Sequence, residues 1–230
     1  MKHFFYAATF LLPFGAAAQQ APPPASAPTV TAADTAVYRY NRYISFMPGT
    51  LRLMDGSTVP AYVPVPTVYP GIDYTFIYYL GYPKSKPKPA KKEMQVAQLQ
   101  SMTAGSHYFE PMRVPGEKKI KILAERFVNG PVEVFLQAEA QRVPVPIPVA
   151  GAILHTAVPY TNSHFFVRRN GLLMQVDRSS FKDVMSQYLQ DYPALATKVR
   201  AGEKDYHYRN LIAIITEFNA HLSSTPTQGQ

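Results

Sequence analysis

The chain has 230 residues, with 23 Lys and Arg against 15 Asp and Glu, and therefore a formal net charge of +8. A hydrophobic fraction of 47% at this length can supply one sizeable core and excludes a wholly disordered protein. The absence of cysteine excludes disulfides, a thiolate nucleophile, Cys-ligated metal sites and lipid attachment at cysteine.

The first eighteen residues have the layout of a bacterial secretory signal peptide. Lys2 and His3 give a basic start, residues 4–14 are apolar, and small residues at 16–18 precede Gln19. The apolar run is shorter than the roughly 20 residues that a retained transmembrane helix needs. We therefore expect secretion across the inner membrane to the periplasm or outside the cell, with no transmembrane segment after processing.

The rest of the chain divides into four segments by composition. Residues 19–36 are rich in Pro, Ala, Ser and Thr, which predicts a flexible leader. Residues 37–177 alternate short apolar or aromatic runs with turn signals, which predicts a β-rich body. Residues 178–222 have a helical period and are expected to pack on that body, and residues 223–230 predict a disordered tail.

Turn signals within the body predict hairpins. Asp55-Gly56, Asn129-Gly130 and Asn170-Gly171 each separate two apolar runs, and such dipeptides tolerate the positive φ angles of tight hairpin turns. We expect about nine or ten strands, too many for one flat open sheet of this size. The predicted fold class is therefore α+β, with an antiparallel β-sandwich or partly closed β-barrel followed by two or three short helices.

Two segments alternate proline with aliphatic residues. Prolines 60, 64 and 66 share one parity, as do prolines 144, 146 and 148, so each set removes amide donors along one edge of a strand. This pattern predicts two edge strands that are blocked against further pairing. A polyproline II linker remains the alternative.

Residues 69–82 are the densest aromatic segment. One strand face carries Ile72, Tyr74, Phe76 and Tyr78, which share one parity, and Tyr79 has the other parity. Aromatic rings are therefore expected on both faces, one of them in the core. The other face is a candidate platform for a sugar ring or a peptide, whereas cross-strand aromatic pairing explains the same residues without a ligand. The candidate binding residues here are Tyr74, Tyr78, Tyr79 and Tyr82.

Most of the positive charge lies in residues 83–92, PKSKPKPAKK, which hold five lysines and no acid. Proline stiffness and repulsion between the lysines predict a loop that stands away from the body. It is interpreted either as a solvated hairpin tip or as a contact site for an anionic envelope surface or acidic glycan. Nucleic acid is not expected as a partner, because base-stacking aromatics do not alternate with the lysines. The candidate binding residues are Lys84, Lys86, Lys88, Lys91 and Lys92.

The C-terminal segment predicts three helices. Ser179 and Ser180 precede an amphipathic stripe from Phe181 to Leu189. Asp191 and Pro193 predict the start of a second helix that Gly202 ends, and a third is expected over 206–222.

No motif identifies a catalytic, cofactor or metal site. His155 and His164 are nine residues apart and would face each other only on adjacent strands of a hairpin. Several acids are present, but a glycosidase needs two carboxylates across one cleft. The acids considered are Asp73, Glu110, Glu125, Glu133 and Asp177. We expect no cofactor and no metal, and regard an enzyme as unsupported.

Five segments carry a diffuse resemblance over roughly residues 43–219. They are Gly49–Gly56, Phe127–Phe135, Phe165–Gly171, Tyr188–Leu195 and Ile214–Asn219. The chain resembles uncharacterised secreted β-rich proteins of Gram-negative bacteria. That resemblance implies strands followed by helices and secretion, but no activity and no site.

These observations favour a non-catalytic binding or interaction module of the periplasm or cell surface, with an anionic envelope surface, a glycan or another envelope protein as partner. Two alternatives stay open. One is a hydrolase acting on envelope glycans or peptides, which a cleft with two convergent acids would favour. The other is a structural subunit of an envelope assembly.

Overall fold

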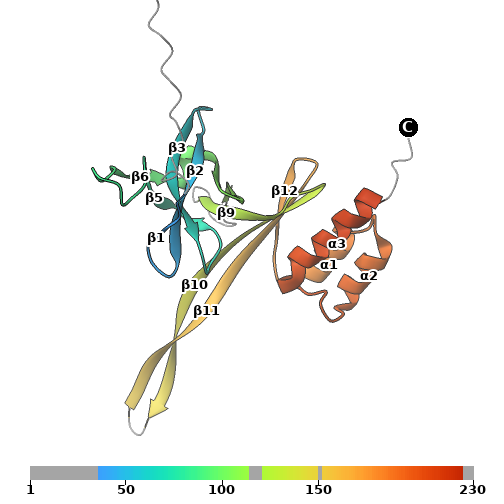
Figure 1. Ribbon diagram of the computed structural model, residues 1–230. Helices are drawn as coiled ribbons and strands as arrows, with labels where there is room; N and C mark the ends of the chain where they lie inside the picture. The colour runs from blue at the N-terminus through green and yellow to red at the C-terminus, as the bar shows by residue number, and fades with distance from the viewer. Residues whose placement is uncertain (1–35, 114–120, 150–151, 225–230) are drawn as a thin grey trace, which may run out of the picture. The chain divides into compact units, whose positions relative to one another are not determined.

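The computed structural model describes residues 36–113, 121–149 and 152–224, without the side chains of residues 121 and 139–161. Strands come first and helices last, so the α+β prediction is confirmed (Figure 1). The strands are β1 (Tyr38–Arg39), β2 (Ile44–Leu53), β3 (Thr58–Pro66), β4 (Ile72–Asp73), β5 (Thr75–Tyr79), β6 (Lys91–Gln95), β7 (Leu99–Ala104), β8 (His107–Arg113), β9 (Lys121–Val128), β10 (Val132–Val149), β11 (Ala152–Arg169) and β12 (Leu172–Val176). The helices are α1 (Phe181–Tyr188), α2 (Pro193–Ala201) and α3 (Leu211–Ser224), with 3-10 turns η2 (Val96–Gln98) and η3 (Tyr208–Asn210).

All strands of the described ranges belong to one antiparallel sheet. Ten of them follow the order β12-β11-β10-β9-β8-β7-β2-β3-β5-β6, while β1 pairs with β2 and β4 pairs with β9. The described sheet therefore has twelve strands rather than nine or ten, and it is not closed. The extra strands are the two-residue β1 and β4, which are too short to leave a periodic signal in the sequence.

The predicted hairpins are confirmed, but the three turns use their glycines differently. Gly56 and Gly171 have φ angles of 84° and 76°, as tight turns require, and they join β2 to β3 and β11 to β12. Gly130, between β9 and β10, lies against α3 instead. A Cβ on Gly130 would approach Asn219 Nδ2 to 2.8 Å, so this glycine allows the helix to come close.

The two proline-rich segments differ in how far they form edges. β3 pairs with β2 from Ile44↔Pro66 to Arg52↔Thr58. The sheet order places β3 between β2 and β5, so the prediction that it is an outermost strand is wrong. Its pairing with β5 is nevertheless confined to Tyr62↔Tyr79. Of residues 60, 62, 64 and 66, which share the proline parity, Tyr62 alone keeps an amide hydrogen.

In β10, the proline-rich part pairs with β11 from Val143↔Val158 to Val149↔Ala152. The described pairing of β10 with β9 is restricted to Val134–Leu136. Within the described pairings, residues 143–149 thus have a partner on one side only, as an edge strand does.

The aromatic segment 72–79 is two strands rather than one. Ile72 and Asp73 pair with β9, whereas residues from Thr75 onward pair with β6. Tyr74 between them has a φ of 33°, which bends the chain from one partner to the other. The prediction that one face runs continuously through Ile72, Tyr74 and Phe76 is wrong at this bend.

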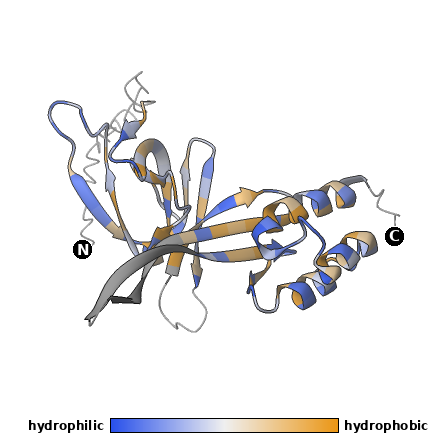
Figure 2. Cartoon of the chain, turned by 90° about the horizontal axis from the view of Figure 1, so that it is seen from below, coloured by the Kyte–Doolittle hydropathy of each residue, from blue (hydrophilic) through white to orange (hydrophobic). Residues whose placement is uncertain are grey.

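The helices pack on the end of the sheet formed by β9 to β12, as the amphipathic stripes predicted. Their apolar residues and those of the sheet form one buried cluster, which includes Val134, Phe165, Met185, Leu195 and Phe218. Along each helix, hydrophilic residues accompany these hydrophobic ones (Figure 2). Burial of one face accounts for why these short helices form at all.

One side-chain contact holds α3 on the sheet, and residues at the two ends of α2 fix where that helix begins and ends. Asn219 of α3 accepts a hydrogen bond from Val132 N (2.9 Å) and donates one to Val132 O (2.7 Å). Pro193 stands in the first turn of α2, and Gly202 ends it with a φ of 68°. The residue that caps α2 is Tyr192 rather than Asp191, and α3 begins at Leu211, after η3, rather than at 206.

The predicted signal peptide, most of the leader and residues 225–230 lie outside the described residues. Among the residues that the structure does describe, no helix combines the length and the apolar character needed to cross a bilayer.

Candidate functional site

A pocket of about 550 Å³ lies beside β5, between β2, β3 and the loop of residues 67–71 that leads to β4. Half of the residues that line it carry rings. Six aromatic and two proline side chains contribute to the lining: Tyr40, Tyr43, Phe46, Tyr69, Phe76, Tyr79, Pro64 and Pro66. No Lys, Arg or His belongs to the lining within the described ranges.

Strand register brings several of these rings to one face, whereas Phe76 has the opposite strand parity. The pairs Ile44↔Pro66 and Phe46↔Pro64 stand directly opposite on β2 and β3, so their four side chains point to the same side. On β5, Ile77 and Tyr79 join this side by the same period of two. Pro64 and Pro66, which offer no amide donor along one edge of β3, also line the pocket with their rings.

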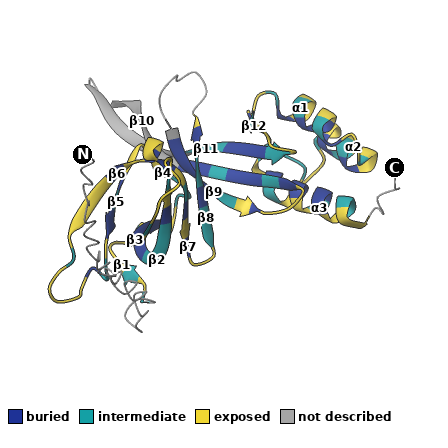
Figure 3. Cartoon of the chain, turned by 90° about the horizontal axis from the view of Figure 1, so that it is seen from above, coloured by how far each residue is buried: buried dark blue, intermediate teal, exposed yellow. Residues whose placement is uncertain are grey.

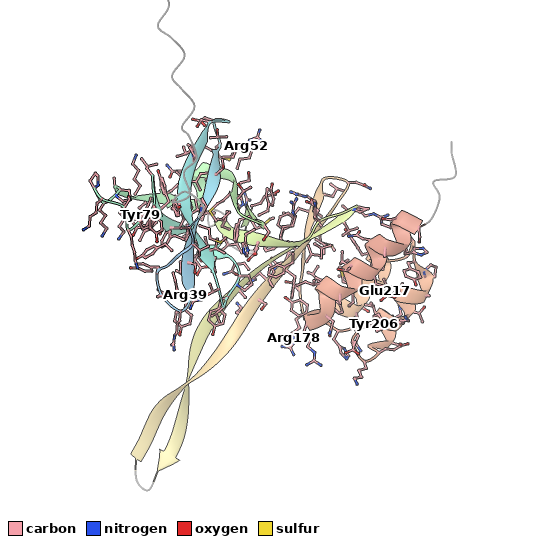
Figure 4. All side chains as sticks on the ribbon, in the orientation of Figure 1. Arg39, Arg52, Tyr79, Arg178, Tyr206 and Glu217 are labelled. Carbon is pink, nitrogen blue, oxygen red and sulfur yellow. The ribbon has the colours of Figure 1, made fainter. Side chains whose placement is uncertain are left out.

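Phe46 is the centre of the aromatic packing. Its ring centroid lies 5.1 Å from that of Tyr79, 5.7 Å from that of Tyr40 and 6.2 Å from that of Tyr38. Burial raises the pKa of the Tyr79 phenol. Phe46 and Tyr79 are 3% and 6% exposed, so they form a fixed floor (Tyr79 is labelled in Figure 4).

The outer rings remain open to solvent. Tyr40 is 54% and Tyr43 is 39% exposed. Tyr43 stacks with Tyr69 at a centroid distance of 6.4 Å, and the Arg42 guanidinium lies 4.5 Å over the Tyr43 ring. The pocket thus combines a buried apolar floor with exposed, polar-tipped rings at its mouth.

Two carboxylates, Asp73 and Glu93, complete the lining. Gln137 of β10 donates a hydrogen bond from Nε2 to Asp73 Oδ1 (2.7 Å) and thereby orients it. Glu93 stands opposite Ile77 across the β5–β6 pair, which places it on the pocket side. Both carboxylates are exposed and lie at the pocket rim rather than in its floor.

The loop that bears Asp73 is anchored to β10. Ala138 N donates to Pro70 O (2.7 Å), and Gly71, with a φ of 91°, lies flat against Gln137. A Cβ at position 71 would come within 3.0 Å of the Gln137 Cα, so the close approach requires glycine. These contacts hold one wall of the pocket in place.

Of the tyrosines predicted from the sequence, only Tyr79 lines the pocket. Tyr78 is buried in the separate core below β5, and Tyr82 packs on Tyr62 with a centroid distance of 5.6 Å. Tyr74 is exposed at the bend and outside the lining. Sequence reasoning did not name Tyr40, Tyr43 or Tyr69 as candidates, although Tyr69 lies within the aromatic segment 69–82, because their place beside Tyr79 depends on contacts between distant segments.

The five lysines of residues 83–92 are all exposed, and β6 is drawn largely as exposed in Figure 3. Lys84, Lys86 and Lys88 lie in the β5–β6 connection, and the other two begin β6. The connection is not wholly detached, because the Lys84 ammonium lies 5.5 Å over the Tyr38 ring. Lys91 stands opposite Tyr79 and so borders the pocket side of the sheet.

Two of the other acids considered as catalytic, Glu110 and Glu133, are engaged in ion pairs across β8 to β11, whereas Asp177 accepts a hydrogen bond from Gln175. Arg168 binds Glu110 (2.6 Å) and Glu133 (2.5 Å), and Arg126 binds Glu133 (2.8 Å). Burial alone would raise the pKa of Glu133, but the hydrogen bonds from the two arginines outweigh it and hold that pKa below its usual value. Hydrogen bonds to Glu110 and to Glu133 raise the pKa of Arg168 above its usual value. The two arginines and two glutamates of this cluster carry equal and opposite formal charges, and their ion pairs join β8 to β11 as a structural brace.

The histidines do not form a pair. His155 and His164 lie on the same strand, β11, so the condition set for them to face each other is not met; the His155 side chain is outside the described set. His107 Nδ1 lies 2.6 Å from Glu125 Oε1. The described residues include no group of three or more metal-ligating side chains.

Comparisons with protein-family models, with curated proteins and with solved structures gave no match for this chain.

Proposed function

We propose that the protein is a secreted, non-catalytic binding module that holds a neutral glycan in the aromatic pocket. The observation that carries the proposal is the lining itself, in which six aromatic rings and two carboxylates occur without a cation among the described residues. Secretion rests on the sequence of the first eighteen residues.

The chemistry of a sugar ring matches this lining. Its C–H faces pack on aromatic planes, and its hydroxyl groups donate to carboxylates and exchange hydrogen bonds with tyrosine hydroxyls. Tyr40 offers a solvent-exposed ring for the first purpose, and Tyr43, whose ring already contacts Arg42 and Tyr69, offers its exposed edge beside it. Asp73 and Glu93 offer acceptors for the second. An anionic ligand fits less well, because both carboxylates would repel it.

Calorimetric titration with neutral cello-, malto- and chito-oligosaccharides tests this function. We expect at least one of them to bind the wild type, and Tyr43→Ala to weaken that binding about fivefold to tenfold through loss of one aromatic ring at the pocket mouth. Phe127→Ala is the matched control, because Phe127 is 45% exposed, comparable with Tyr43, but lies outside the pocket. No binding by any oligosaccharide, or equal losses in both variants, would contradict the proposal.

A hydrolase is the second candidate, because two carboxylates do line one pocket. Binding without cleavage is favoured since a general acid is usually sheltered from water, whereas Asp73 and Glu93 are both exposed. Chromatography of a bound oligosaccharide after long incubation separates the two. Fragments that form with the wild type but not with Asp73→Asn or Glu93→Gln would establish the hydrolase instead.

A further inference from the structure

A second cavity, of about 980 Å³, lies where β11 and β12 meet α1 and η3. Its lining is polar, in contrast to the aromatic pocket. The residues are Asn162, Ser163, His164, Phe165, Gln175, Asp177, Arg178, Ser179, Phe181, Lys182, Asp183, His207, Tyr208 and Arg209. Three stretches of the chain supply them, residues 162–165, 175–183 and 207–209, and none of these residues belongs to the aromatic pocket.

The floor of this cavity is rigid. The Tyr208 ring packs edge-on against Phe165 (5.1 Å between centroids) and Phe181 (5.9 Å). Its hydroxyl donates to Ser163 O (2.8 Å), and burial raises the pKa of this phenol. Tyr208 therefore joins η3 to β11 and fixes the distance between the two sides of the cavity.

Three cationic side chains converge on the cavity from different segments. Arg178 comes from the β12–α1 connection, Lys182 from α1 and Arg209 from η3 (Figure 4 labels Arg178). No carboxylate of the described residues lies within 4.0 Å of these three groups, whereas Arg126, Arg168 and Arg169 each have such a partner. His164 and His207 add two imidazoles to the lining.

Asp177 and Asp183 also belong to the lining, so the three cations exceed the carboxylates by one formal charge, and no ion pair joins these acids to the three cations among the described residues. Asp177 accepts a hydrogen bond from Gln175 Nε2 (2.8 Å), and Asp183 lies in the first turn of α1. Cationic groups held around one cavity repel one another, and an oxyanion between them removes that repulsion while accepting charge-assisted hydrogen bonds.

Lys182 is confined by the backbone on the side of α2. Its Nζ occupies the space that a side chain at Gly202 would take, and the His207 ring borders the same space. Lys182 is an exposed residue whose ammonium lies beside Gly202 and near the His207 ring, at the wall of the cavity.

We propose that this cavity binds the phosphate or carboxylate group of a small anionic molecule, with Arg178, Lys182 and Arg209 as its charge partners and the imidazoles of His164 and His207 as further hydrogen-bonding groups. The site is separate from the aromatic pocket and does not depend on glycan binding there.

Nuclear magnetic resonance titration of the histidine ring signals tests the site. Inorganic phosphate and citrate are the two probes, each measured against sodium chloride at equal ionic strength. We expect saturable shifts of His164 and His207 with at least one probe, while His107 stays unchanged. Which probe saturates distinguishes a phosphate site from a carboxylate site.

The triple variant Arg178→Gln, Lys182→Gln and Arg209→Gln should abolish saturation, and Arg178→Gln alone should weaken binding about tenfold. The control is Lys84→Gln, Lys86→Gln and Lys88→Gln, which removes equal charge elsewhere and should leave the affinity unchanged. The single variant keeps the test decisive if the triple variant does not fold. Shifts that sodium chloride reproduces, that do not saturate, or that the control reduces equally would overturn the proposal.

Discussion

The two ends of the sheet use their aromatic residues in opposite ways. At the helical end, Phe165, Phe181 and Phe218 are at most 5% exposed and sealed by α1 to α3. At the other end, Tyr40 and Tyr43 remain exposed around a pocket. Rings that fold stability requires are covered by the chain itself, so exposed rings gathered around a cavity point to a ligand as their partner.

The largest expected effect is at the helical end. Phe218→Ala removes a fully buried ring from the cluster that joins α3 to the sheet and should lower the free energy of unfolding by about 3–5 kcal/mol. Urea denaturation followed by circular dichroism measures the loss. Phe127→Ala, at an exposed ring, should cost less than about 1 kcal/mol. Similar losses in both variants would show that the helices are not sealed on the sheet as described.

A second prediction concerns the ion-pair brace between the two ends. Arg168→Gln leaves Glu110 and Glu133 without their shared cation and should cost about 2 kcal/mol, less than a fully buried pair because these side chains are partly exposed. The difference in unfolding free energy between the wild type and Arg168→Gln should shrink in acid. Glu133 has a lowered pKa in the folded state, so the stability that its ionised form contributes is lost as the pH falls through that pKa. Arg52→Gln, at an exposed arginine, is the control for urea denaturation. A cost equal to that control would remove the brace from the account.

The pocket wall at Gly71 can be tested with a paired substitution. Gly71→Ala and Gly56→Ala both place a side chain at positive φ, which costs about 1 kcal/mol or more. Only at position 71 does the new Cβ also meet Gln137, since nothing lies within 4 Å at Gly56. Thermal unfolding should therefore show the larger loss for Gly71→Ala. Equal losses would mean that the loop does not press on β10.

Alkaline pH should destabilise the fold through buried phenols. Burial raises the pKa values of Tyr108, Tyr188 and Tyr208 above the usual 10.0, so their neutral forms are favoured in the folded state. Their contribution is complete below pH 10.0 and is lost as the pH rises through the raised values. Ultraviolet absorbance should show these phenols ionising later than the exposed ones, together with falling stability. Tyr208→Phe should shift the loss of stability to higher pH, and an unchanged profile would argue against the assignment.

The smallest effect on stability is expected at the lysines of residues 83–92. Changing Lys84, Lys86, Lys88, Lys91 and Lys92 to Gln should alter the free energy of unfolding by under about 0.5 kcal/mol, because all five are exposed. If they contact an anionic envelope surface, sedimentation with phosphatidylglycerol vesicles should fall in the variant and stay low with phosphatidylcholine vesicles. Equal sedimentation of variant and wild type would assign the lysines to solubility alone.

Local signals predicted the fold better than they predicted the site. Positive-φ dipeptides such as Asn170-Gly171 and the helical stripe from Phe181 marked hairpins and helices, because those signals depend on neighbouring residues. The bend at Tyr74 carried no such signal, since the φ of 33° follows from pairing with β9 on one side and β6 on the other.

The pocket depends on contacts between distant segments. Tyr43 and Tyr69 stack although the sequence separates them, and Gln137 reaches Asp73 from β10. Only the β2–β3 register and the anchoring of the loop at Pro70 bring these groups together. The density of aromatic residues in 69–82 identified Tyr79, the one of the four candidate tyrosines that lines the pocket.

Mapping of oligosaccharide contacts by nuclear magnetic resonance tests the central claim most directly. The tyrosine ring signals of the full chain are followed while the tightest-binding neutral oligosaccharide is added. The account predicts saturable shifts at Tyr40, Tyr43, Tyr69 and Tyr79, with Tyr188 and Tyr208 unchanged. Shifts confined to tyrosines outside the pocket, or none at saturating sugar, would contradict it.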